Sequence, residues 1–327
     1  SATDLADSSF ISETGAINVG TVANIINSTI WAKAGAVEIT EITDELDGST
    51  ITSATSLTLT GKWIVDSALI AEDGLLKVTA TTIDGSELLA KAGNAEVDAD
   101  SIIASSITAI KGAVDPGDVT ITGADKITGS DVIAYNNLTV NAKDADIENS
   151  TLTAYNTVSL TAYDVSNLNV FAQSGITAIL GKFGPMYNGE LSGGEWKVDG
   201  GNIDISANSI SGTEFTAHGN VDLKTIASIT NAGVTVLGPG NTATLNAFQN
   251  IRNTTVASDA AVTLKAGSNI ADTGVTAGSD ASLTAARIGG TTVTAGGKID
   301  VTGTVDSAIG DSSLTALTGD ITIAKMV

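Results

Sequence analysis

Apolar and polar residues alternate along the whole chain in groups of three that return at a regular distance. The groups have the form apolar–polar–apolar, as in Leu57-Thr58-Leu59, Val119-Thr120-Ile121 and Ile203-Asp204-Ile205. Sixteen such triplets occur, about 20 residues apart on average. Alternation with a period of two and many β-branched residues is typical of short strands with one buried face. No long window shows helical periodicity.

Two further short elements lie between successive triplets. One reads apolar-Thr-Ala, as in Ile107-Thr108-Ala109 and Val293-Thr294-Ala295, and the other is a lone isoleucine such as Ile147 or Ile270. Gly, Asn, Asp and Ser separate the three elements, and these residues favour tight turns. Three short strands per repeat predict an all-β fold, a single right-handed parallel β-helix (β-solenoid) of about 16 turns with roughly 20 residues per turn.

Departures from the repeat define the expected organisation. Residues 1–16 precede the first triplet and are predicted to form an N-terminal docking strand or cap, and residues 17–327 form the solenoid. All three prolines fall in gaps that are longer than average: Pro116, Pro185 and Pro239. Because proline cannot donate to a strand ladder, these gaps are predicted to be loops outside the sheets. The longest predicts a loop insertion near residues 181–200.

The composition agrees with a narrow, strand-lined interior. Aromatic residues are only 4% of the chain, and we expect Val, Ile, Leu and Ala to fill the interior, with no room for large rings. Threonines between the apolar residues then point outward and stack on those of the next turn. An ice-binding surface needs two regular threonine columns. The threonine positions drift between repeats and charged residues interrupt them, so the sequence does not favour that function.

Charge and residue content exclude several functions. The net charge of -22 would repel the phosphates of a nucleic acid. No apolar stretch approaches the roughly 18 residues of a membrane span, so membrane insertion is not expected. With no cysteine, disulfides and thiolate metal sites are excluded. An acidic, Thr- and Asn-rich, cysteine-free chain predicts an extracellular or cell-surface protein.

Catalytic chemistry finds little support in the sequence, which predicts neither an enzyme nor a cofactor. His218 is the only histidine, and the aspartates are scattered. The pairs Asp98/Asp100 and Asp144/Asp146 are candidates for weak Ca²⁺ binding, although solvated corners explain them better. A polysaccharide-active enzyme on the same fold would need clustered carboxylates, and it stays a remote alternative.

Three groups of residues are candidates for interactions. The aromatic residues of the insertion could contact a partner or glycan, or could pack over a weak turn: Phe183, Tyr187 and Trp196. Apolar residues near both ends are candidate end-to-end contacts: Phe10, Ile11, Ile17, Val19, Ile321 and Ile323. Four asparagines stand in Asn-x-Ser/Thr triplets and are candidate glycosylation acceptors: Asn27, Asn137, Asn149 and Asn253.

The segments 137–142 (Asn-Leu-Thr-Val-Asn-Ala) and 157–162 (Thr-Val-Ser-Leu-Thr-Ala) carry a resemblance to a known family. With their repetition at about 20 residues, they resemble the filamentous-haemagglutinin-like adhesins exported by two-partner secretion. The resemblance spans nearly the whole chain. It implies adhesion or a fibrous surface role, and it transfers no site residues.

Two functional hypotheses follow. The first is an extracellular structural subunit whose turns stack head to tail into a homopolymeric filament or surface layer, because exposed strand edges favour further pairing. The second is an adhesin segment that binds a glycan or a host or cell-surface receptor through residues 183–196.

Overall fold

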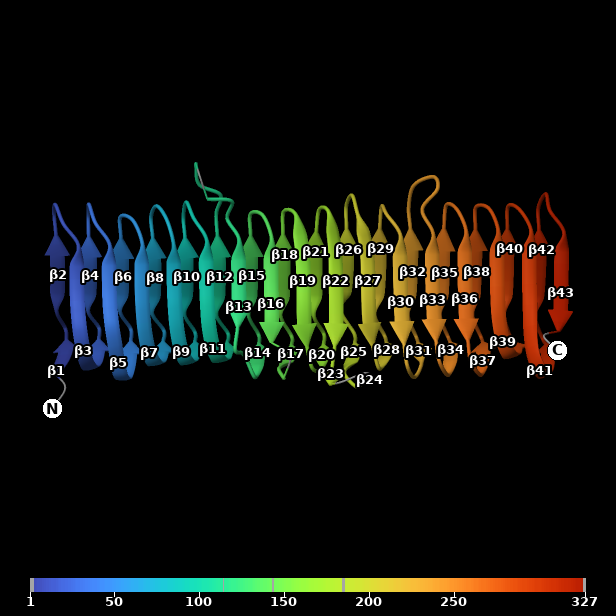
Figure 1. Cartoon of the computed structure of the whole chain (residues 1–327), viewed down its shortest axis with the longest axis horizontal. Helices are drawn as coiled ribbons and strands as arrows, with labels where there is room; N and C mark the ends of the chain where they lie inside the picture. Colours follow the sequence, from blue (N-terminus) through green and yellow to red (C-terminus); the bar gives the residue numbers. More distant parts are fainter. Residues whose placement is uncertain (1–2, 114, 143, 184–185, 326–327) are drawn as a thin grey trace. The chain divides into compact units, whose positions relative to one another are not determined.

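The computed structural model describes residues 3–113, 115–142, 144–183 and 186–325, with the backbone alone at 182–183, 186–187, 304–308 and 325. These residues contain strands and turns and no helix. Parallel strands stack about 19 residues apart and form a β-solenoid of about 16 turns, which confirms the predicted fold (Figure 1). The chain divides into two compact units, Ser1–Thr161 and Ala162–Val327.

In unit 1 each turn contributes to a long sheet and a short sheet. The long sheet contains β1 (Thr3–Ala6), β3 (Ile17–Ile26), β5 (Val37–Asp47), β7 (Leu57–Val65), β9 (Leu76–Asp84), β11 (Ala95–Ile103), β13 (Val119–Thr122), β14 (Lys126–Thr128), β16 (Leu138–Ala142), β17 (Asp146–Glu148) and β19 (Thr157–Ala162). The short sheet contains β2 (Ser9–Ser12), β4 (Thr29–Ala32), β6 (Thr50–Ser53), β8 (Ala68–Ala71), β10 (Glu87–Ala90), β12 (Ser106–Ala109), β15 (Asp131–Ala134) and β18 (Thr151–Ala154).

Unit 2 repeats this organisation. Its long sheet contains β20 (Val165–Ser166), β22 (Gly175–Leu180), β25 (Glu190–Ser192), β27 (Asn202–Ala207), β28 (Ser209–Ser211), β30 (Val221–Thr225), β31 (Ile229–Thr230), β33 (Ala243–Ala247), β34 (Asn250–Arg252), β36 (Val262–Ala266), β37 (Asn269–Ala271), β39 (Ala281–Gly289), β41 (Ile299–Gly310) and β43 (Ile321–Lys325). Its short sheet contains β21 (Asn169–Ala172), β26 (Glu195–Val198), β29 (Glu214–Ala217), β32 (Gly233–Val236), β35 (Thr255–Ser258), β38 (Gly274–Ala277), β40 (Thr292–Ala295) and β42 (Ser313–Ala316).

The N-terminal segment 1–16 contributes strands to unit 1. Strand β1 pairs in parallel with β3, and β2 pairs in parallel with β4, with Phe10 opposite Ile30. These residues therefore form a turn of the stack. Pro116 and Pro239 lie outside the strands, between β12 and β13 and between β32 and β33. Pro185 lies outside the described residues.

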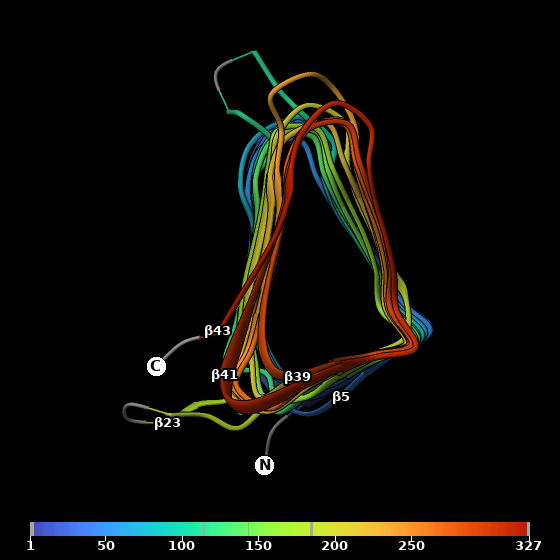
Figure 2. The same ribbon diagram turned by 90° about the vertical axis from the view of Figure 1, so that its right-hand side faces the viewer.

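Register between turns places equivalent residues in columns. In unit 1, Leu76 and Val78 of β9 lie opposite Ala95 and Val97 of β11. The same pairing recurs in unit 2 along β30 and β33. Each turn has three sides (Figure 2), and the apolar residues at alternate strand positions are buried. The columns of buried Val, Ile, Leu and Ala therefore form one continuous core within each unit, as alternation predicts.

Unit 2 also places two large rings in its interior, contrary to the expectation that such rings would not fit. Trp196 and Phe215 lie opposite each other on β26 and β29 and are 0% and 1% exposed. Their ring centroids are 6.3 Å apart, with planes inclined by 59°. Val170 and Val234 occupy the same column in the adjacent turns. One stretch of the core is thus wide enough for an aromatic pair.

Every turn bends at one corner through a residue with a left-handed backbone, with φ between 45° and 67°. These residues are Asp7, Asn27, Gly48, Asp66, Gly85, Ala104, Gly129 and Asn149 in unit 1, and Asn167, Gly193, Gly212, Asn231, Asn253, Asp272, Gly290 and Asp311 in unit 2. Gly, Asn and Asp tolerate this conformation best, which explains why they separate the predicted strands.

Immediately after this corner, unit 1 has a serine in every turn. We call the set the serine column: Ser8, Ser28, Ser49, Ser67, Ser86, Ser105, Ser130 and Ser150. Each backbone N–H donates to the Oγ of the serine in the following turn, at 2.9–3.2 Å, through seven successive hydrogen bonds. All but Ser8 are buried. The hydroxyls therefore satisfy N–H groups that the strands leave unpaired at the corner.

We expect Ser86→Ala to destabilise the protein by about 1–2 kcal/mol, since it leaves the buried N–H of Ser67 without its acceptor. Ser159→Ala removes an exposed hydroxyl of β19 and should change stability by less than about 0.5 kcal/mol. Urea denaturation followed by circular dichroism measures both. Equal effects of the two variants would contradict a structural role for the serine column.

Candidate functional site

The predicted insertion is shorter than residues 181–200. Strands β23 (Lys182–Phe183) and β24 (Met186–Tyr187) form an antiparallel hairpin that projects from the turns (Figure 2). Asn188 closes its base by donating from its backbone to the carbonyl of Gly181 at 2.9 Å. Strand β25 begins at Glu190 and pairs with β28. The insertion therefore ends near Gly189.

Only part of the predicted aromatic loop remains a candidate. Phe183 and Tyr187 lie on the hairpin, but their side chains fall outside the described residues. Trp196 lies on β26 in the core, so the prediction that it contacts a surface partner is wrong. Alternation places it inward, whereas its closeness in sequence to the insertion suggested a loop.

Three of the four candidate glycosylation asparagines share one structural position. Asn27, Asn149 and Asn253 are the left-handed corner residues of their turns and are exposed. Asn137 differs, because it is half-buried and its Oδ1 accepts hydrogen bonds from Asn156 Nδ2 at 2.9 Å and Thr157 Oγ1 at 2.7 Å. At these three sites the hydroxyl residue of the triplet is the first residue of the following short-sheet strand: Thr29, Thr151 or Thr255. The triplets therefore span a corner at which Asn, like Gly and Asp, tolerates the left-handed backbone.

The candidate end-to-end residues lie on β2 and β3 in unit 1 and on β43 in unit 2, and β3 pairs with both β1 and β5. In unit 1, Phe10 and Ile11 are 40% and 52% exposed, and Ile17 and Val19 are half-buried. In unit 2, Ile321 and Ile323 of β43 are 44% and 59% exposed.

The scattered acids and the histidine stay apart. Asp98, Asp100, Asp144 and Asp146 are exposed, and within the described residues no group of three or more His, Asp or Glu side chains could hold a metal ion. His218 is exposed just after β29, and its backbone carbonyl accepts a hydrogen bond from Asn241 Nδ2 at 2.7 Å.

Threonine positions are more regular than the sequence spacing indicates. On the short sheet of unit 2, one outward column holds Thr216, Thr235, Ala257, Thr276, Thr294 and Thr315. The expectation that threonines drift between turns is wrong for this sheet. The neighbouring column holds Glu214, Gly233, Thr255, Gly274, Thr292 and Ser313, so it does not form the second regular threonine column.

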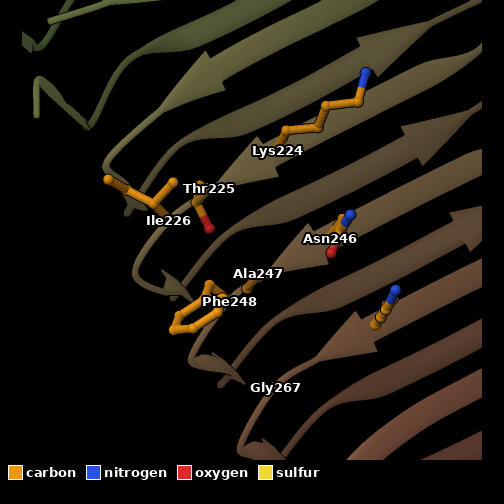
Figure 3. Close-up of a pocket in the computed structure, with 8 residues that line it drawn as sticks. Lys224, Thr225, Ile226, Asn246, Ala247, Phe248 and Gly267 are labelled. Atoms are coloured by element: carbon orange, nitrogen blue, oxygen red, sulfur yellow. The ribbon is translucent and has the colours of Figure 1, made fainter. Parts of the chain in front are cut away.

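A hollow on the outer surface of unit 2 combines apolar, amide and cationic side chains. It has a volume of about 470 Å³. We call it the Phe248 groove, lined by Lys224, Thr225, Ile226, Asn246, Ala247, Phe248, Lys265 and Gly267 (Figure 3). Strands β30, β33 and β36 supply these residues together with the bends that follow them.

Strand alternation sets the positions of the polar side chains of the groove. Lys224, Asn246 and Lys265 share one outward column of three adjacent strands. Their inward neighbours Leu223 and Leu245 are 0% exposed and fix the strands to the core. Figure 3 shows Lys224 and Asn246 in a row on successive strands.

The apolar wall of the groove lies at the bend that follows these strands. Ile226 is 38% exposed and Phe248 is 74% exposed, the largest value among the exposed large apolar side chains of the described residues. Figure 3 shows both side chains extending outward at the strand ends. At the equivalent bend of the next turn, Gly267 has no side chain, and an added Cβ would collide with the backbone carbonyl of Phe248. The ring of Phe248 therefore has no side chain beside it on that turn.

The two lysines of the groove differ in their partners. Lys224 Nζ lies 2.7 Å from Asp222 and 3.8 Å from Asp204. No ion pair involves Lys265 within the described part of the chain, and its column neighbours are Asn246 and Thr284. Residues 223–258 contain no Asp or Glu, the longest such interval in this acidic chain. Lys265 is thus a cation with no carboxylate in its own column.

Several other lysines are paired with nearby acids. Lys33 contacts Glu13 at 2.7 Å, and Lys91 contacts Glu72 at 2.8 Å. A hydrogen bond to Asp300 raises the pKa of Lys298. Both arginines of the chain, Arg252 and Arg287, line a second hollow of unit 2, of about 320 Å³.

This arrangement provides binding chemistry. An exposed ring offers an apolar face, an amide both donates and accepts hydrogen bonds, and an ammonium attracts an anion. Sequence reasoning missed the groove because it followed the cluster of aromatic residues at 181–196. The acid-free interval around the isolated Phe248 was the available signal.

Comparisons with protein-family models, with curated proteins and with solved structures found no match to this chain. Among the described residues, no helix has the length and apolar character needed to cross a membrane.

Proposed function

We propose that this chain is an extracellular, non-enzymatic structural protein whose solenoid is a scaffold that associates with further copies through strand pairing. The observation that supports this most is the register between turns. Most long-sheet strands pair in continuous register with the strand before them, as β41 and β43 do from Ile299↔Ile321 to Gly303↔Lys325. The register shifts are at β1/β3, β3/β5, β5/β7 and β39/β41. A scaffold of this kind offers the same pairing pattern to any strand that is added.

Head-to-tail addition is the form of association that the outermost strands favour. Strand β43 pairs with β41 along one side, and its inward-type residues Ile321 and Ile323 are exposed. In unit 1, β2 pairs with β4 and carries the exposed Phe10 and Ile11. Covering the inward-type residues Ile321, Ile323 and Phe10 while pairing backbone groups is favourable on both counts. The acidic composition supports an extracellular setting, where the net charge of -22 keeps separate copies soluble.

Sedimentation velocity over a concentration series, with negative-stain microscopy, tests this association. We expect the mass of the wild-type protein to increase with concentration and end-to-end assemblies to form. The variant Ile321→Glu/Ile323→Glu should remain monomeric, because a charge within a strand interface disfavours pairing. Thr322→Glu, on the outward side of β43, is the matched control and should still assemble. Monomers of wild-type protein at every concentration, or equal assembly of both variants, would reject the proposal.

A second function, adhesion, is favoured by one specific observation, the Phe248 groove with its exposed ring and unpaired lysine. For an adhesin, this groove is a candidate contact surface in addition to Phe183 and Tyr187 of the hairpin.

A further inference from the structure

We propose that the Phe248 groove binds an acidic polysaccharide, with a uronate carboxylate at Lys265 and the apolar face of a sugar ring against Phe248. This inference goes beyond the structural role and does not depend on self-association. It assigns a ligand class to a surface of unit 2. Three properties of the groove carry it: the charge at Lys265, the exposure of Phe248 and the spacing of the polar column.

The charge at Lys265 favours an anion. Its ammonium is exposed, and the column beside it contains Asn246 and Thr284, both uncharged. Lys224 already contacts Asp222 and Asp204, so Lys265 is the residue assigned to the ligand. The protein as a whole repels polyanions, so a polyanion that binds must do so through a local site of this kind.

The exposure of Phe248 favours a ligand with an apolar face. Burying a phenylalanine side chain is favourable, and Phe215 of the same unit is fully buried. Phe248 instead extends from the bend with 74% of its surface accessible. Ile226 stands at the equivalent bend of the preceding turn. A pyranose ring has one face of C–H groups, which suits such a surface, and hydroxyls at its edge, which suit the amide of Asn246.

The spacing of the column favours an extended polymer over a compact anion. Lys224 and Lys265 are two strands apart in the same column, roughly 9.6 Å along the direction of stacking. Asn246 lies between them in the column. A polysaccharide that runs across adjacent turns can place sugars against Phe248 and Asn246 of one turn and Lys265 of the next. An acidic polypeptide shares the charge but lacks the C–H face.

Affinity electrophoresis and titration calorimetry with polygalacturonate test the assignment on the full chain. We expect wild-type protein to bind, and its affinity to decrease as salt increases. Phe248→Ala and Lys265→Ala should each weaken binding at least tenfold, whereas Lys265→Arg should retain it. The matched controls Trp63→Ala and Lys126→Ala remove an exposed ring and an exposed lysine of unit 1 and should bind as wild type.

Matched ligands separate the chemistry of the contact. Fully methyl-esterified polygalacturonate has the same sugars without the charge and should bind at least tenfold more weakly. The proposal is overturned if wild-type protein does not bind polygalacturonate, or if the control variants lose as much affinity as the groove variants. Tighter binding of poly-glutamate would reassign the groove to an acidic polypeptide, and tighter binding of dextran sulfate would overturn the assignment of a carboxylate.

Discussion

Replacing Trp196 by alanine is expected to destabilise unit 2 by about 3–5 kcal/mol, the usual effect of truncating a large buried aromatic residue. Trp196 is fully buried, with Phe215 beside it in the following turn of its column and Val170 beside it in the preceding turn. A β-solenoid cannot close around the cavity, because the backbone at each level is hydrogen-bonded to the turns above and below it. Guanidinium denaturation followed by circular dichroism measures the loss.

Two further variants make this prediction specific to the core. Trp63→Ala removes a tryptophan that is 39% exposed in unit 1 and should cost less than about 1 kcal/mol. Trp196→Phe keeps an aromatic ring and removes the indole Nε1, which is buried with no hydrogen-bond partner in the structure. It should therefore lose much less stability than Trp196→Ala. Wild-type stability of Trp196→Ala would show that the aromatic pair does not support the core.

Replacing Gly93 by alanine is expected to destabilise unit 1 by about 3 kcal/mol, at the upper end of the range for overpacking. Gly93 lies at the tight corner after β10, where the backbone of one turn rests on that of the turn before. A Cβ at this position would collide with the carbonyl of Gly74. Relief requires separating two stacked turns, because backbone atoms cannot rotate away as a side chain can.

Gly20 provides the matched control in the same unit. No atom lies within 4 Å of a Cβ added to Gly20, and its backbone is not left-handed. Gly20→Ala should therefore stabilise the protein slightly, by about 0.5 kcal/mol, by restricting the unfolded chain. Thermal denaturation of both variants should shift in opposite directions. A shift of the same sign and size for both would mean that the corner tolerates a side chain and that the stacking is looser than the structure indicates.

The groove also bears on how a repetitive scaffold acquires a specific site. The outward columns of the short sheet of unit 2 hold mostly small and polar residues, such as Thr235, Ala257 and Thr276. Phe248 instead stands at a bend of the long sheet, and Lys265, which lines the same groove, has no ion pair within the described residues. A single turn can carry such a change because its inward residues still pack as in every other turn. We therefore expect Phe248→Ala and Lys265→Ala to weaken binding without lowering stability. Both variants should retain the wild-type denaturation profile.

The sequence alone determined the fold class, the number of turns and the positions of most strands. Alternation and the recurrence of Gly, Asn and Asp are local properties, since a strand needs a period of two and a left-handed corner needs a residue that tolerates it. The serine column also lies in the sequence, as a serine after each corner residue of unit 1. Its function became evident only when each hydroxyl was found opposite the N–H of the turn before it.

The tertiary structure alone decided which residues share a column. Lys224 and Asn246 are 22 residues apart, whereas Asn246 and Lys265 are 19 apart, yet all three lie in register. The loop around Pro239 absorbs the difference, and spacing in the sequence does not reveal which residues leave the stack. For the same reason Trp196, close to an insertion in sequence, lies in the core, while Ile226, Phe248 and Lys265 meet on one surface. Long-range backbone pairing sets these neighbours, and no local pattern encodes it.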